Sequence, residues 1–239
     1  MCSLSLFPAR PEEAPPWHPY RAAALMAVLT FPALLLDLPV GRLSAEGLGP
    51  PELRRVLAWS EVFAHGLGVA IIAGAVWVLD PSRRRQVPRL LASAYLAGLL
   101  ANLGKLAVAR LRPRCFSFQG GVAETFVGWL PLLWGTSSGV PSGSSMQSFP
   151  SGHAATAVGL AVALTRMYPR GRWLFPLMAL AAALQRIDTG AHFVSDTVAA
   201  AALGLLAAGW VGDPRGLGRF FDRLEGRASI AGTAPPTLD

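Results

Sequence analysis

The sequence predicts an all-α, polytopic membrane protein, a bundle of six transmembrane helices. Hydrophobic residues make up 52% of the 239 residues and charged residues only 15%, whereas about a quarter of the residues in a typical soluble domain are charged. Long stretches rich in Ala, Leu and Val recur, and arginines gather between them. Apolar segments separated by basic loops are typical of a chain that crosses the bilayer repeatedly.

The basic character of the chain does not indicate a nucleic-acid partner. The formal net charge is +7, but the sequence holds no basic patch interleaved with aromatic residues. Arginines between apolar segments instead predict cytoplasmic loops that face anionic lipid. We therefore expect membrane lipids as partners and no nucleic acid, and the sequence leaves the oligomeric state open.

Three segments follow one another along the chain. Residues 1–20 are rich in proline and are predicted to form a flexible N-terminal arm. Residues 21–211 hold the six spans, and residues 212–239 form a basic C-terminal tail with a disordered end. The spans are predicted at about 21–38, 56–79, 88–110, 153–168, 173–186 and 192–211.

The second predicted span carries two ionisable residues, Glu61 and His65. They are four residues apart, so a continuous helix would place them on one face. Ionisable groups within a membrane helix are costly and usually face the interior of the bundle. We expect either a buried polar pair between helices or a contact with the head group of a substrate.

The connection between the third and fourth spans, residues 114–149, contains the aromatic and apolar segment Phe126–Trp134. This segment is too short to cross the bilayer and is predicted to lie at the interface as a helix or loop. The fourth and fifth spans are shorter than the usual length of about 20 residues. Their polar ends should therefore lie recessed among the lipid head groups.

The basic loops predict the orientation of the chain. The Arg83–Arg85 loop, the loop after the fourth span and the C-terminal tail fall on one side, together with the N-terminus. This side is predicted to be cytoplasmic, on the inner (plasma) membrane, and the opposite side periplasmic. Cys2 and Cys115 then lie on opposite sides, so no disulfide is expected, and neither cysteine has metal-ligand spacing.

Lys105 and Arg112 mark the outer end of the third predicted span. They are seven residues apart, a spacing that places both on one face of a helix. Each side chain could snorkel towards the head groups, but snorkelling does not explain why Lys105 lies so far inside the span. Arginine suits bidentate contact with phosphate, and lysine supplies a point charge.

The tetrapeptide Pro150-Ser151-Gly152-His153 opens the fourth predicted span. Ser151 can cap the helix through its hydroxyl, and Gly152 lets a bound group approach the backbone closely. The first amides of a helix have no internal partners and favour an anion. His153 can carry a proton at this position. Taken alone, the tetrapeptide is equally compatible with an ordinary capped helix that carries a surface histidine.

Arg186, His192 and Asp196 form the third cluster. His192 and Asp196 are four residues apart at the start of the sixth predicted span. The carboxylate can therefore accept one imidazole N–H, fix the tautomer and leave the other nitrogen basic. The alternative is a His–Asp hydrogen bond that only packs two helices.

Together these clusters predict a site for a phosphoryl group. The predicted phosphate ligands are Lys105, Arg112, Arg186 and the amides of Ser151 and Gly152. His192 is the predicted nucleophile, giving a phosphohistidine, and His153 protonates the leaving oxygen and then activates water. Asp196 supports His192, and the cations stabilise charge on the phosphoryl oxygens. No Asp/Glu/His cluster has two-metal spacing, so we expect neither a metal nor a cofactor.

The three clusters, in this order, resemble the signature of the type-2 phosphatidic-acid phosphatase superfamily, which also includes vanadium-dependent haloperoxidases. The matching patterns are Lys-x6-Arg-Pro at 105–113, Pro-Ser-Gly-His at 150–153 and Arg-x5-His-x3-Asp at 186–196. The resemblance covers the motif core, residues 88–211. It implies a six-span helical bundle that acts as a membrane lipid phosphatase at the outer leaflet. The implied substrates are polyprenyl diphosphate, phosphatidylglycerol phosphate, phosphatidic acid and lipid A phosphate.

One position departs from the pattern of this superfamily. Gln185 stands before Arg186, where the family usually has serine. Glutamine still offers a donor and an acceptor, so we expect altered tuning of the site and not a loss of activity.

Other functions are compatible with the same residues. A lipid phosphotransferase would use the same phosphohistidine but release little free phosphate when an acceptor is present. A non-catalytic lipid-binding protein is disfavoured because every predicted catalytic residue is present. A transporter is disfavoured because the ionisable residues gather at one face and not at mid-membrane, where transporter sites tend to lie.

Overall fold

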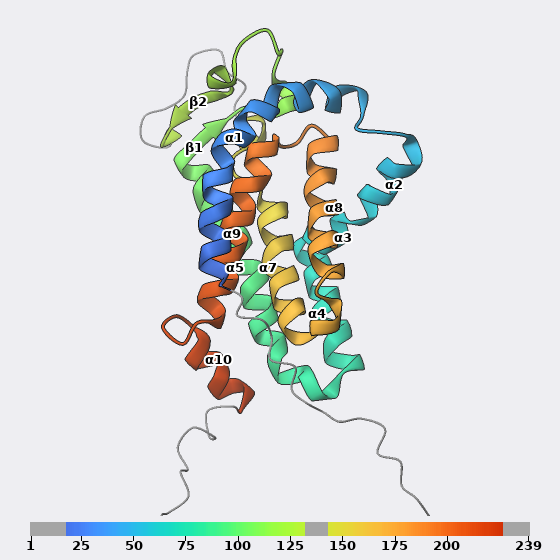
Figure 1. Cartoon of the computed structure of the whole chain (residues 1–239), viewed down its shortest axis with the longest axis vertical. Helices are drawn as coiled ribbons and strands as arrows, with labels where there is room; N and C mark the ends of the chain where they lie inside the picture. Colours follow the sequence, from blue (N-terminus) through green and yellow to red (C-terminus); the bar gives the residue numbers. More distant parts are fainter. Residues whose placement is uncertain (1–17, 132–142, 227–239) are drawn as a thin grey trace, which may run out of the picture.

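A computed structural model describes residues 18–131 and 143–226, and helices dominate this part of the chain (Figure 1). The α-helices are α1 (Pro19–Glu46), α2 (Pro51–Trp59), α3 (Glu61–Ala64), α4 (Gly66–Leu79), α5 (Val87–Ala107), α7 (Gly152–Met167), α8 (Leu174–Asp188), α9 (Val194–Gly212) and α10 (Gly218–Glu225). The strands are β1 (Val108–Arg110) and β2 (Phe126–Trp129), and the 3-10 turn η1 (Pro81–Gln86) joins α4 to α5.

Helix α7 forms the centre of the bundle, between α5, α8 and α9 (Figure 1). Small residues line its contacts, and Ala155 and Ala157 are completely buried. A Cβ atom at Gly159 would lie only 2.5 Å from the carbonyl oxygen of Ser93 on α5, so this glycine permits the close approach of the two helices. Helix α1 packs along α9 on the outside of this core.

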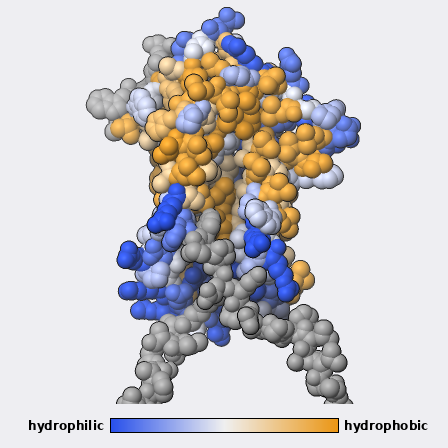
Figure 2. All heavy atoms as spheres, viewed as in Figure 1, coloured by the Kyte–Doolittle hydropathy of each residue, from blue (hydrophilic) through white to orange (hydrophobic). Residues whose placement is uncertain are grey.

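The outer surface of the bundle is apolar, as a bilayer requires. Leu35 on α1 and Leu79 on α4 are about four-fifths exposed, at 78% and 80%. Figure 2 shows hydrophobic side chains over the middle and upper part of the visible face and hydrophilic ones gathered at its lower end. Such a large exposed apolar surface is unfavourable in water but suits lipid.

Three described segments are long and apolar enough to cross a membrane, namely Pro19–Glu46, Pro81–Ala107 and Val194–Gly212. A fourth is obtained if Pro51–Ala64 and Gly66–Leu79 are counted as one broken span. Helices α7 and α8 have only 16 and 15 residues, which agrees with the short fourth and fifth spans expected. The chain is therefore helical and apolar as predicted, and the count of six spans stays a prediction.

The second predicted span is not one continuous helix. It is divided into α2, α3 and α4, and the two halves meet at an angle of 72°. His65 lies at the break with an extended backbone, and its Nδ1 accepts a hydrogen bond from the amide of Leu67 at 3.3 Å. Glu61 and His65 therefore do not share one helix face. An imidazole that caps the next helix competes with continuation of the first helix.

A small antiparallel sheet corrects the all-α prediction. β1 follows α5 directly, and Val108 pairs with Trp129 of β2. The predicted interfacial segment Phe126–Trp134 therefore begins as a strand, and its last residues lie outside the described part of the chain. After α5 ends, the chain continues close to the membrane, where unpaired backbone N–H and C=O groups are costly. The sheet supplies hydrogen-bond partners to these groups.

The two ends of the bundle are formed by different elements. The end with β1 and β2 holds the predicted site residues, and α10 lies at the opposite end (Figure 1). Within the predicted tail, α10 is an amphipathic helix tied to α5, because Arg89 contacts Asp222 and Glu225 at 2.6 Å each. The predicted arm up to residue 17 and the tail beyond residue 226 lie outside the described residues.

Candidate active site

The N-terminus of α7 is the centre of the candidate site. Ser151 is its N-cap, with the side-chain oxygen accepting from the amide of Ala154 at 3.4 Å. Ser151 is completely buried, and its own amide donates to the carbonyl oxygen of Asp196 at 3.2 Å. The start of α7 is thereby fixed to the start of α9.

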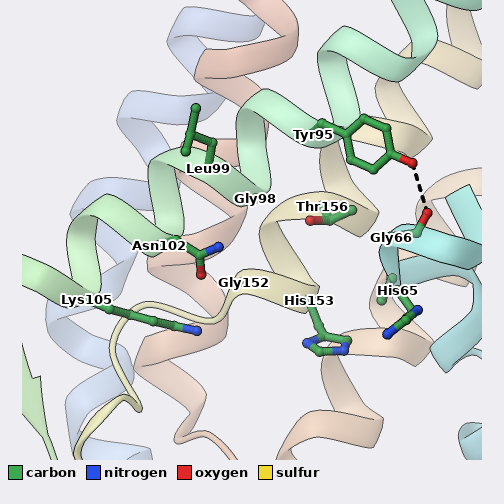
Figure 3. Close-up of a pocket in the computed structure, with 11 residues that line it drawn as sticks. His65, Gly66, Tyr95, Gly98, Leu99, Asn102, Lys105, Gly152, His153 and Thr156 are labelled. Carbon is green, nitrogen blue, oxygen red and sulfur yellow. Dashed lines mark hydrogen bonds between the residues drawn. The ribbon is translucent and has the colours of Figure 1, made fainter. Parts of the chain in front are cut away.

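Lys105 lies in the last turn of α5 and reaches the N-terminus of α7. A Cβ atom at Gly152 would lie 3.6 Å from Lys105 Nζ and 3.5 Å from Asn102 Oδ1. In Figure 3 the ammonium group of Lys105 points towards Gly152, and Asn102 lies beside it. A larger residue than glycine would fill the space between the helix amides and these two side chains.

Arg112 joins the same group from a different element than predicted. Helix α5 ends at Ala107 and the chain continues as β1, so Lys105 and Arg112 do not lie on one helix face. Within the described residues, the buried Nε of Arg112 has no hydrogen-bond partner. Burial lowers the pKa of Arg112, and the positive charges of Arg114 and Arg186 act in the same direction. A cation that keeps a buried donor free is suited to an anionic ligand.

His192 lies between α8 and α9, and its side chain is almost completely buried. Its Nδ1 is 2.6 Å from the carbonyl oxygen of Ser148. A carbonyl oxygen can only accept, so Nδ1 carries the proton and Nε2 keeps its lone pair. Burial lowers the pKa of His192, whereas its contacts with Asp196 and Ser148 oppose this shift.

The predicted direct hydrogen bond between His192 and Asp196 is wrong. The shortest distance, from His192 Nδ1 to Asp196 Oδ2, is 3.8 Å, which is too long for a hydrogen bond. Asp196 Oδ2 instead accepts from Ser148 Oγ at 2.5 Å and from the amide of Phe193 at 2.8 Å. Asp196 therefore acts on His192 through Ser148, whose carbonyl fixes the tautomer.

Arg186 and His153 meet Glu61 at the edge of the site. Glu61 Oε1 is 3.3 Å from Arg186 Nη2 and 3.9 Å from His153 Nε2. The rings of His65 and His153 have centroids 6.0 Å apart. Arg186 also donates through Nε to Gln185 Oε1 at 2.5 Å, so Gln185 supplies an acceptor that orients this arginine. Glu61 and His65 thus border the site and do not form a buried polar pair.

A cavity of about 420 Å³ opens beside His153. Helix α5 contributes Tyr95, Leu99, Asn102 and Lys105 to its wall, and the break between α3 and α4 contributes His65 (Figure 3). Tyr95 donates to the carbonyl oxygen of Gly66 at 3.0 Å and holds the two walls together. Tyr95 and Leu99 are 43% and 54% exposed, so the cavity reaches from His153 and Lys105 to the outer apolar surface.

Sequence reasoning missed three residues of the site. Ser148 and Asn102 carry no motif signal, because their roles depend on contacts between elements far apart in the chain. Arg110, which donates to Asp196, follows an apolar helix, and a charge in such a place is a signal of function. Asp188, the last residue of α8, carries no motif signal either. This residue is buried and pairs with Arg54 at 3.2 Å, and it accepts from the amide of Leu48 at 2.8 Å.

Among residues 18–131 and 143–226, no group of three His, Cys, Asp or Glu side chains could hold a metal ion. The positive charge at the site comes from Lys105, Arg112 and Arg186. Arg112 interacts electrostatically with both Arg186 and His192, and His153 interacts with Lys105. The arrangement can therefore bind and polarise an anion beside two imidazoles.

Two imidazoles, three cations and the N-terminus of α7 thus come from the three segments that carry the motifs of the sequence. Residues 86–212 match the PAP2 superfamily, and the chain belongs to this superfamily.

Two curated relatives are similar to part of the chain. The lipid A 1-phosphatase of Rhizobium etli is 34% identical over 122 residues, which cover 51% of this chain and 45% of that protein. The lipid A 1-phosphatase of Rhizobium johnstonii is 34% identical over 113 residues, which cover 47% of this chain and 41% of that protein. The chain thus spans less than half the length of either relative.

The crystal structure of Aquifex aeolicus LpxE has a similar fold. Its TM-score is 0.51 at 18% sequence identity, and the alignment covers 72% of this chain and 92% of that chain. At this identity the likeness concerns the fold alone.

Proposed function

We propose that the chain is an integral-membrane lipid phosphatase that hydrolyses a phosphate monoester or diphosphate through a phosphohistidine, without a metal. The observation that carries this proposal is the buried His192, whose Nδ1–H is directed to the carbonyl of Ser148 at 2.6 Å. This hydrogen bond leaves Nε2 with a lone pair beside a group of cations. Membership of the PAP2 superfamily supports the same chemistry.

In the first step, Nε2 of His192 attacks phosphorus and forms a P–N bond. The bond between phosphorus and the leaving oxygen breaks, and His153 donates a proton to that oxygen. His153 lines the cavity and His192 is not among its lining residues, which suits protonation by His153 of a leaving group held in the cavity. The charge that develops on the phosphoryl oxygens is stabilised by fixed donors and not by mobile water.

In the second step, His153 is neutral and accepts a proton from a water molecule. The oxygen of this water attacks phosphorus, the P–N bond breaks and free phosphate leaves. His192 and His153 return to their starting states, so atoms and protons balance over the cycle.

The proposed phosphate ligands come from four elements. Lys105, Arg112 and Arg186 supply the charge, and the amides of Ser151 and Gly152 supply the N-terminus of α7. The free Nε of Arg112 supports a direct contact with a phosphoryl oxygen. Glu61 Oε1 lies 3.3 Å from Arg186 Nη2, so a phosphate competes with this carboxylate for the guanidinium group.

The relatives favour a lipid A phosphate among the candidate substrates, since both are lipid A 1-phosphatases. The cavity beside His153 has the position that a leaving group needs, with Asn102, His65 and Lys105 for a polar head group and Leu99 towards the lipid. We propose that Glu61 and His65 contact this head group. Phosphatidic acid, phosphatidylglycerol phosphate and polyprenyl diphosphate remain the substrates to compare.

We further propose an inner-membrane location, with the site on the periplasmic face and both termini in the cytoplasm. The basic loops Arg83–Arg85 and Arg166–Arg172 support this orientation, because positively charged loops favour the cytoplasmic side. Cysteine labelling at position 82 in intact cells tests it, in a Cys115→Ser background because Cys115 is an exposed free cysteine. Labelling of Ser82→Cys from outside would contradict the proposal.

The central test is release of phosphate from a panel of lipid phosphates in detergent with excess chelator. We expect release by the parent protein, and a loss of about 10⁴-fold or more in His192→Ala, since residues that act as the nucleophile dominate the rate. Acid-labile, base-stable incorporation of radioactive phosphate should disappear in the same variant. Release that needs a divalent metal, or that persists in His192→Ala, would contradict the mechanism. Transfer to an added acceptor with little free phosphate would identify a phosphotransferase instead.

A further inference from the structure

Two buried charged residues, Asp37 and Arg110, lie behind the site and have no role in binding the phosphate. Both side chains are 0% exposed. Asp37 is in α1 and Arg110 ends β1, and their closest atoms, Asp37 Oδ2 and Arg110 Nη2, are 2.6 Å apart. A buried ion pair is weak evidence for stability, because the cost of desolvation offsets the attraction. Its connections to the rest of the molecule therefore indicate what it does.

The guanidinium group of Arg110 has a single fixed orientation. It lies between the rings of Phe126 and Phe193, with Cζ 4.4 Å from each ring centroid. Its Nε donates to Thr125 Oγ1 at 3.0 Å. The planar group is thus fixed on both faces and at one edge, and its remaining donors point to the carboxylates.

Asp37 connects α1 to the first turn of α9. Its Oδ1 accepts from the amide of Ser195 at 2.9 Å, and its Oδ2 accepts from Ser195 Oγ at 2.6 Å. Arg110 Nη1 donates to Ser195 Oγ at 2.8 Å and also to Asp196. The three charged groups therefore hold the start of α9 against α1 and β1.

The same group reaches the nucleophile through Ser148. Asp196 Oδ2 accepts from Ser148 Oγ at 2.5 Å, and the amide of Ser148 donates to the carbonyl of Arg110 at 3.1 Å. The carbonyl of Ser148 then accepts from His192 Nδ1. Arg110 thus holds Ser148 twice, once through its main chain and once through Asp196, and Ser148 orients the imidazole.

The charges of this group favour formation of a phosphohistidine. Two carboxylates and one guanidinium leave a formal charge of −1 behind His192. When Nε2 attacks phosphorus, the imidazole ring becomes cationic, and a buried negative charge stabilises it. Without Arg110, Asp37 and Asp196 would be two buried carboxylates that share no cation.

We propose that Asp37 and Arg110 are positioning residues for His192, so that α1 contributes to the active site and does not only anchor the chain. Asp37 lies outside the segment 86–212 that matches the superfamily, and no motif of the sequence marks it. This inference rests on the proposed function, because it concerns the nucleophile of that reaction.

The first test is Asp37→Asn, which keeps the size and the acceptor oxygen but removes the charge. We expect kcat to fall by about 10- to 100-fold, as for other residues that orient a catalytic group, with KM nearly unchanged. Arg110→Gln should lose at least as much activity. Arg110→Lys should recover part of it, because it restores the charge without the planar fork. Equal activity of the lysine and glutamine variants would contradict a role of this charge.

A matched control is Asp188→Asn. Asp188 is also a buried carboxylate with an arginine and an amide as partners, and it makes no described contact with Ser148 or His192. We expect a comparable loss of thermal stability, but a kcat per folded molecule within about twofold of the parent. If Asp37→Asn behaves like this control, its role is structural and the inference is wrong.

Binding of orthovanadate separates this inference from the proposed function. Vanadate mimics the transition state of phosphoryl transfer and binds the nucleophile of such a site. We expect Asp37→Asn and Arg110→Gln to bind vanadate at least about 10-fold more weakly than the parent by calorimetry. A parent that binds vanadate but hydrolyses no lipid phosphate would refute the proposed function. The comparison of vanadate affinity between the parent and its variants would still test the positioning role. Variants that bind as tightly as the parent would refute the positioning role, and a parent that binds no vanadate would refute both.

Discussion

Arginine–carboxylate pairs occur at both ends of the bundle, but they serve different purposes. At the α10 end, Arg89 contacts Asp222 and Glu225, and the three residues join α5 to α10. At the opposite end, Arg110 is enclosed by Asp37 and Asp196, whereas Arg112, two residues later, keeps a buried donor without a protein partner among the described residues. Each of the three guanidinium nitrogens of Arg110 thus has a protein partner, whereas the Nε of Arg112 has none among the described residues.

Two arginines that are near neighbours in sequence also differ in their surroundings. Arg110 and Arg112 flank a single leucine, yet Arg110 contacts Asp37 of α1 and Asp196 of α9, and Arg112 belongs to the proposed phosphate site. A regular extended segment would place residues two positions apart on the same side, so the end of β1 at Arg110 is what allows the two arginines to face different partners. The count of basic residues at one end of the bundle therefore does not reveal which of them contact the substrate.

Among variants that test this comparison, Arg112→Lys should cause the largest loss of activity. The substitution keeps the charge but removes the planar set of donors, so we expect phosphate release to fall by about 10²- to 10³-fold. Initial rates on the best lipid substrate measure this effect. The matched control is Arg89→Lys at the other end, which should retain nearly full activity. Similar losses in both variants would show that the two ends do not differ as proposed.

A smaller effect is expected from Arg89→Met, and on stability only. The guanidinium that joins Asp222 and Glu225 to α5 is removed, which should reduce the free energy of unfolding by about 1–3 kcal/mol. For a chain of this size, thermal unfolding in detergent should shift by about 2–4 °C per kcal/mol. The kcat of the folded fraction should match that of the parent. A loss of kcat without a loss of stability would contradict the structural role of this end.

The smallest expected effect concerns pH. Burial lowers the pKa of His192 from its usual value of 6.5, so the ring stays neutral, and nucleophilic, in more acidic solution than an exposed histidine. Since protonation of Nε2 stops the reaction, the acid limb of the kcat/KM profile should lie below pH 6.5. A profile measured on the best lipid substrate checks this prediction. An acid limb above pH 6.5 would mean that the negative charge of Asp196 outweighs burial.

The sequence was informative about the helices and the motif residues because both depend on local patterns. Apolar stretches predicted the helices, and the Pro-Ser-Gly-His pattern predicted the cap of α7 by Ser151. The second span was predicted wrongly because a helix pattern does not reveal a break at His65, where a side chain caps the following helix. The strand Phe126–Trp129 was missed because its partner, Val108–Arg110, reads as the end of an apolar helix.

By itself, the sequence determined that this chain is an apolar helical membrane protein with a group of cations and histidines at one end, since these properties follow from composition and spacing. Only the tertiary structure decided which atoms meet. The imidazole of His192 contacts the carbonyl of Ser148 and not Asp196 directly, and Asp37 of α1 is connected to this group through Arg110. Such contacts join residues up to 158 positions apart, as between Asp37 and Ser195. No local pattern encodes them, because they arise only when α1, β1 and α9 pack together.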